Sequence, residues 1–92
     1  MTKYFMCSLC HNGILGGGLC IDDTAIIYKT NKLTVAPEYR KIVMPLNEIH
    51  EITWEKGILP IATFHMANGK EYKFLIFFKS SCIKSYQQIT NS

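Results

Sequence analysis

The sequence has few charged residues and no long apolar segment. Only 18% of its 92 residues are charged, below the usual ~25%. The longest uncharged apolar run, Phe74–Phe78, is far shorter than the ~20 residues of a membrane-spanning helix. No basic segment followed by an apolar stretch opens the chain, as one would in a signal peptide. We therefore expect a cytoplasmic protein without membrane spans.

Basic charge is also too dispersed for nucleic-acid binding. Ten Lys or Arg residues accompany seven Asp or Glu residues, giving a formal net charge of +3. Nucleic-acid recognition usually needs a concentrated basic stripe, so we expect no nucleic-acid partner. The stretch from Tyr4 to Tyr28 contains no Lys or Arg at all, which argues against phosphate recognition there.

The chain contains no linker, repeat or low-complexity segment. Its length fits a single domain over residues 1–92, because two independent cores would need more chain. Apolar types make up 48%, a normal share for a folded protein. With so few charged residues, a small domain has limited polar surface, and this favours contact with a partner or with a second copy.

Frequent turn signals divide most of the chain into strands. The segment Asn68-Gly69 lies between two strand-like runs and is the strongest hairpin signal, because both turn positions need positive φ. β-branched and aromatic residues dominate the runs between the turns. The seven predicted strands are Tyr4–Cys10, Gly17–Ile21, Ala25–Thr30, Tyr39–Met44, Ile49–Glu55, Leu59–Ala67 and Lys70–Phe77.

The last segment changes to helical periodicity. Cys82, Ile83, Tyr86 and Ile89 fall on one helical face, and serines at 80 and 81 precede them as N-cap candidates. The fold class predicted is therefore mainly β, with a single C-terminal helix. The strands form a seven-stranded antiparallel barrel or sandwich, and the helix buries its apolar face by capping one open end.

A series of short segments in fixed order resembles a GRAM domain of the pleckstrin-homology-like superfold. A glycine-led strand and acidic turn, Gly18–Asp23, precede an apolar strand. The signature Met44–Ile49 follows, then an aromatic strand pair around Asn68-Gly69 and the helix. The resemblance covers about residues 13–90. It implies a module that binds lipid head groups or proteins without catalysis. Independently, Pro45 suits a strand end, and one tight turn after it could place both Leu46 and Ile49 in the core.

Four residues near the start of the chain have the chemistry of zinc ligands: Cys7, Cys10, His11 and Cys20. The first three also match the c-type haem attachment pattern, which requires an exported setting. A zinc site would need a turn between Cys7 and Cys10, and a hairpin centred near Gly13-Ile14 would place Cys7 opposite Cys20. Because Cys20 has no paired cysteine, we favour core cysteines with free thiols and predict no cofactor. If the thiols were oxidised, a disulfide among them would be the alternative.

Catalytic chemistry is not apparent in the sequence. His50 and His65 are expected to face solvent, without a nucleophile and an orienting carboxylate in mutual reach. The glycine cluster Gly16–Gly18 lacks the strand-to-helix context of a phosphate loop, so we expect a flexible hairpin loop there. We predict neither enzymatic activity nor a small-molecule substrate.

Two surfaces are candidates for contact with partners. The first is apolar: Ile14 and Leu15 on the expected glycine-rich tip, and Phe77 in a run that is apolar on both faces. The second is a basic group that flanks the loop between the third and fourth strands and could contact an anionic surface: Lys29, Lys32, Arg40 and Lys41.

From these surfaces we expect a non-catalytic binding module that acts through protein–protein contacts, self-association included. A peripheral membrane module that binds anionic lipid surfaces is the first alternative. A zinc-stabilised domain is the second.

Overall fold

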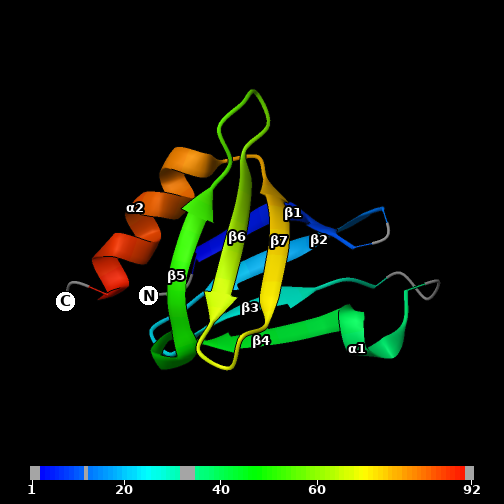
Figure 1. The fold of residues 1–92 in the computed structure, drawn as a ribbon, viewed down its shortest axis with the longest axis horizontal. Helices are drawn as coiled ribbons and strands as arrows, with labels where there is room; N and C mark the ends of the chain where they lie inside the picture. Colours follow the sequence, from blue (N-terminus) through cyan, green and yellow to red (C-terminus); the bar gives the residue numbers. More distant parts are fainter. Residues whose placement is uncertain (1–2, 12, 32–34, 91–92) are drawn as a thin grey trace.

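Seven antiparallel strands form a single sheet, and a C-terminal helix packs beside it (Figure 1). The computed structural model describes residues 3–11, 13–31 and 35–90. The elements are β1 (Lys3–Cys10), β2 (Ile14–Ile21), β3 (Ala25–Lys29), α1 (Pro37–Arg40), β4 (Lys41–Pro45), η1 (Leu46–Glu48), β5 (Ile49–Trp54), β6 (Ile61–Met66), β7 (Glu71–Ile76) and α2 (Lys79–Thr90). This architecture confirms the predicted fold class.

The strand order is β4-β3-β2-β1-β7-β6-β5. Two meanders, β1 to β4 and β5 to β7, are therefore joined through β1, which pairs with both β2 and β7. Cys7 is opposite Gly17 on one side and Ile76 on the other. Within the part of the chain that the structure describes, β4 and β5 are the two edges of the sheet, and α2 lies beside β5 (Figure 1).

The core is built from alternate residues of both meanders. Tyr28, Phe64 and Phe74 are its largest fully buried side chains, and the Phe74 ring centroid lies 5.4 Å from each of the other two. The Tyr28 hydroxyl donates a hydrogen bond of 2.6 Å to the carbonyl oxygen of Leu15, so its polar atom is satisfied. Burying each aromatic side chain stabilises the fold by roughly 1.5–3 kcal/mol.

Gly17 and Gly18 lie in β2, in agreement with the predicted strand Gly17–Ile21, whereas Gly16 also belongs to this strand and not to the flexible loop expected there. The hairpin turn is short, Gly13 has a φ of +121°, and β2 begins at Ile14. At Gly17 a Cβ would collide with the carbonyl oxygen of Lys29 and lie 2.9 Å from the Tyr28 ring. The absence of a side chain at Gly17 therefore lets β3 and the Tyr28 ring approach β2 closely.

The fourth strand begins later than the sequence predicted. Residues 37–40 form a short helix with proline in its first turn, and β4 starts at Lys41. Beyond Pro45 the chain makes a single 3-10 turn. Both Leu46 and Ile49 are half-buried against the core, which confirms the one-turn geometry expected there. At the start of β5 the pairing with β6 has a register shift between Ile49 and Glu51.

Candidate functional site

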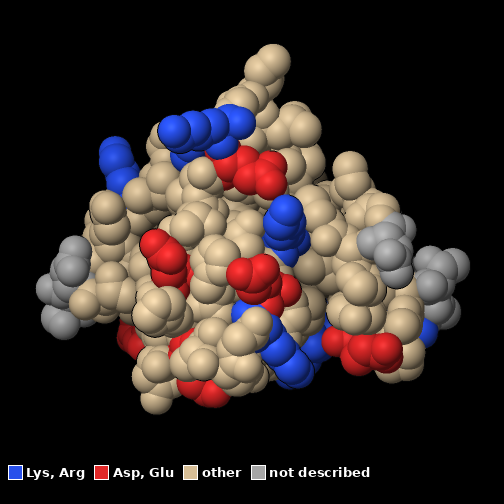
Figure 2. All heavy atoms as spheres, viewed as in Figure 1, with Lys and Arg blue, Asp and Glu red and all other residues tan. Residues whose placement is uncertain are grey.

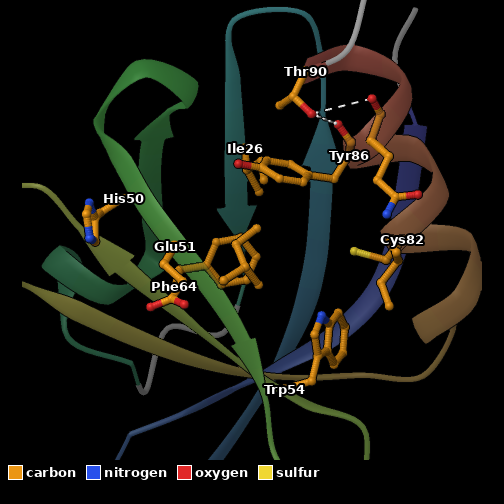
Figure 3. Close-up of a pocket in the computed structure, with 11 residues that line it drawn as sticks. Ile26, His50, Glu51, Trp54, Phe64, Cys82, Tyr86 and Thr90 are labelled. Atoms are coloured by element: carbon orange, nitrogen blue, oxygen red, sulfur yellow. Dashed lines mark hydrogen bonds between the residues drawn. The ribbon is translucent and has the colours of Figure 1, made fainter.

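A groove of about 580 Å³ lies between α2 and β5 (Figure 3). Ile26 of β3 and Phe64 of β6 are fully buried side chains at its base. The half-buried side chains of Ile52 and Trp54 form the β5 wall. The α2 wall consists of Cys82, Ile83, Tyr86, Gln87 and Thr90. The groove is thus predominantly apolar, with polar side chains toward one end.

The helical periodicity of the last segment places α2 against the sheet. Cys82 is buried and Tyr86 is half-buried against the core, because they lie one turn apart on the same helical face. Burial raises the pKa of the Cys82 thiol to about 11 and also raises the pKa of Tyr86. Both groups are therefore neutral near pH 7, which keeps this wall uncharged. At the start of the helix, the Lys79 Nζ lies 5.1 Å from the centre of the Trp54 ring.

The β5 wall is an unpaired strand edge. The Glu55 N–H donates to the carbonyl oxygen of Ile61 at 2.9 Å, so the backbone of Glu55 faces β6. Backbone groups alternate sides along an antiparallel strand, and the N–H and C=O groups of Ile52 and Trp54 therefore point away from β6. Such an edge is a template for another strand.

One end of the groove lies where β5 begins. His50 and Glu51 lie there, near the register shift that opens β5. Among the residues that the structure describes, the Glu51 side chain makes neither an ion pair nor a hydrogen bond. Because Glu51 is opposite His65 whereas Ile52 is opposite Phe64, the Glu51 carboxylate lies on the face of β5 away from α2 and adds no charge to the groove wall.

Comparison with known proteins shows a likeness of fold. The chain is similar to the C-terminal domain of an unknown protein from Leishmania infantum, with a TM-score of 0.80 and 9% sequence identity. The match covers 98% of this chain and 83% of that one. No protein-family model matches the chain, and no curated protein matches its sequence. At this identity the likeness shows the fold alone.

The structure does not bring the four predicted zinc ligands together. Cys7 is buried and pairs with Gly17, whereas Cys20 pairs with Tyr4 several residues along the strand. Cys10 lies three residues after Cys7 on a continuous strand and so points to the opposite face. The fourth predicted ligand, His11, instead stacks on Tyr39 with ring centroids 4.1 Å apart. Within residues 3–11, 13–31 and 35–90, no three His, Cys, Asp or Glu side chains are placed to hold a metal ion.

The predicted basic surface is reduced to a pair of lysines. Lys29 and Lys41 are exposed cross-strand partners on β3 and β4. The Arg40 side chain instead donates from Nε to the carbonyl oxygen of Val35 at 2.8 Å. Lys32 lies outside the described residues.

The predicted apolar contact residues are separated in the structure. Ile14 and Phe77 are exposed, but Leu15 is half-buried and packs against the core. Sequence reasoning missed the most exposed large apolar side chain, Ile58, because a Lys-Gly turn and Pro60 suggested only a loop there. It also missed several other exposed apolar side chains: Tyr4, Met6, Leu59 and Phe78.

A hydroxyl, an imidazole and a carboxylate form a chain across β5, β6 and β7. Nε2 of His65 lies 2.8 Å from Oγ1 of Thr53, and its Nδ1 lies 2.7 Å from Oε2 of Glu71. The expectation that His65 lacks such partners was wrong, since cross-strand register brings together residues distant in sequence. The order matches a hydrolase triad. However, backbone groups alternate sides along β5, so the N–H of Thr53 points toward β6 and lies within the sheet ladder. It is therefore not free to stabilise an oxyanion formed at the Thr53 hydroxyl.

A membrane span is not among the described elements. None of the helices found in the described ranges is both long enough and apolar enough to cross a bilayer.

Proposed function

We propose that this chain is a non-catalytic, pleckstrin-homology-like binding module that holds an extended segment of a partner protein in the groove between β5 and α2. The observation that carries this proposal is the unpaired edge of β5 bordering an apolar groove of about 580 Å³. That volume is within the range of ~300–1,000 Å³ typical of ligand pockets.

An added strand fits both walls of the groove. The outward backbone groups of Ile52 and Trp54 would hydrogen-bond to the partner, which gives affinity independent of its sequence. Alternate side chains of the partner would then face the groove, where the half-buried Trp54 and Tyr86 are available for packing. Specificity would thus come from the apolar pockets.

Two observations support the assignment to the pleckstrin-homology-like class and a role without catalysis. The seven strands followed by one helix agree with the GRAM-like order of segments in the sequence. The Thr53–His65–Glu71 chain lies on exposed to half-buried side chains of adjacent strands, and the backbone N–H of its hydroxyl residue is directed into the ladder. We therefore interpret it as a network that stabilises the sheet.

The test is selection from a display library of random linear peptides on the full chain. We expect enrichment of peptides with alternating apolar residues. The variant Gln87→Trp fills the groove from α2 and should weaken binding of the selected peptides at least about tenfold. Gln88→Trp is the matched control, because Gln88 is exposed on the same helix and does not line the groove.

Equal loss in the two variants, or no enrichment over an unrelated domain, would contradict the proposal. Binding that survives Gln87→Trp would place the peptide elsewhere on the surface. Light scattering on the same samples separates peptide binding from self-association, in which a second copy would supply the added strand.

A further inference from the structure

Four large apolar side chains are exposed on two neighbouring connections. Ile58 and Leu59 lie in the loop between β5 and β6, with 101% and 58% of their surface exposed. Phe77 and Phe78 lie between β7 and α2, with 58% and 57% exposed. We refer to these four residues as the apolar tip. Exposure on this scale at one place marks an interaction surface rather than ordinary surface scatter.

The two connections are held together at their bases. The Ile76 N–H donates to the carbonyl oxygen of Pro60 at 3.0 Å, so the end of β7 is fixed to the end of the loop. Within the loop, the N–H of Ile61 donates to the carbonyl oxygen of Leu59, and Gly57 supplies a φ of +149°. Figure 1 shows this loop rising above the sheet, next to the connection that leads into α2. The tip is therefore convex, and backbone hydrogen bonds hold its two connections together.

Basic residues flank the apolar tip. Lys56 lies in the loop itself, and Lys79 is the first residue of α2, directly after Phe78. The nearby acid, Glu55, pairs with Lys73 at 3.4 Å, which offsets its charge. In Figure 2 the loop protrudes from the molecular surface, and Lys or Arg side chains gather near its base. The charge at this end is thus positive around an apolar centre.

We propose that the apolar tip docks on an anionic lipid bilayer by inserting its side chains into the membrane interface. A convex loop with a fully exposed isoleucine suits the headgroup–acyl boundary of a bilayer. The phenylalanines would lie in the interface, and Lys56 and Lys79 would contact anionic headgroups. A protein partner would instead need a pocket to receive the convex tip.

This site differs from the membrane surface predicted from the sequence and from the peptide groove. The lysine pair Lys29 and Lys41 lies on β3 and β4, whereas the tip is formed by the β5–β6 loop and the connection before α2. The groove lies between β5 and α2, and none of the four tip residues lines it (Figure 3). A docked molecule could therefore still receive a partner strand.

The test is cosedimentation of the full chain with vesicles of phosphatidylcholine containing about one third phosphatidylserine. We expect binding that falls in high salt and on neutral vesicles. The double variant Ile58→Ser with Leu59→Ser should lower the partition coefficient at least about tenfold. Met6→Ser is the control, because Met6 is an exposed apolar residue on β1, away from the tip, and this variant should bind as the native chain does.

The contribution of the lysines and the depth of insertion into the bilayer are tested separately. Lys56→Glu should weaken binding several-fold, whereas Lys29→Glu should leave it unchanged. Trp54, the single tryptophan, ends β5 directly below the loop, so brominated lipids should quench its fluorescence in the bound state. The proposal is overturned if the native chain does not bind vesicles, or if the Ile58→Ser, Leu59→Ser variant binds them equally well. It is also overturned if brominated lipids quench Trp54 in that variant as strongly as in the native chain. Loss of self-association in the tip variant without any vesicle binding would also overturn it, in favour of a protein contact.

Discussion

At the scale of single residues, the cysteines are structural groups. Cys7 and Cys82 are 2% and 4% exposed, and desolvation raises the pKa of Cys7 to about 12 and that of Cys82 to about 11. A thiol with so high a pKa is neither a nucleophile nor a metal ligand near neutral pH. The two behave as small apolar side chains between the sheet and α2.

Stability should fall at alkaline pH because of these two thiols. Above about pH 9 the unfolded chain loses both thiol protons, whereas the folded chain keeps them until about pH 11 for Cys82 and 12 for Cys7. The unfolded state then binds fewer protons, so the free energy of unfolding decreases as pH rises. The decrease is up to about 1.4 kcal/mol per pH unit for each thiol.

Urea unfolding between pH 8 and 11 measures this decrease. The variant Cys82→Ala should have a shallower pH dependence, and Cys20→Ser, at a half-buried position on β2 that does not contribute to the raised pKa of Cys7, should keep the native slope. A native slope in Cys82→Ala would show that another group is responsible.

At the scale of elements, the approach of β3 to β2 depends on Gly17. Gly17→Ala should lower the free energy of unfolding by roughly 1–3 kcal/mol, because its Cβ has to displace the Lys29 carbonyl or the Tyr28 ring. Thermal or urea unfolding measures the loss. Gly18→Ala is the control, since the nearest atom to its Cβ would be the Phe5 carbonyl oxygen at 4.0 Å. Similar losses in the two variants would mean that glycine flexibility matters here rather than close packing.

Local patterns predicted most elements, and long-range contacts explain the misses. Alternation placed β6 and β7, the Asn-Gly turn joined them, and the spacing of Cys82, Tyr86 and Ile89 predicted α2. The start of β2 was placed too late, at Gly17 and not Ile14, and the need for glycine at position 17 could not be predicted because the Tyr28 ring that approaches it comes from another strand. The hydrogen-bond partners of His65 were missed for a similar reason, because they come from neighbouring strands and only the register between the strands brings them together.

At the scale of the whole molecule, the proposed binding site depends on which strands form the two edges of the sheet. Pairing of β1 with β7 joins the two meanders and leaves β5 as an open edge, beside which α2 packs. No local sequence pattern specifies that juxtaposition, so the groove could not be predicted, although several of its lining residues were correctly assigned to strands and a helix. The apolar tip was predicted only in part, through Phe77.

The central claim is that a partner strand adds to β5. Amide hydrogen exchange of the full chain, with and without a library-selected peptide, tests it most directly. We predict that exchange at the Ile52 and Trp54 amides slows at least about tenfold when the peptide binds. The Thr53 amide, already directed toward β6, should change little. Protection confined to the other sheet edge at β4, or no change at Ile52 and Trp54 under saturating peptide, would contradict the account.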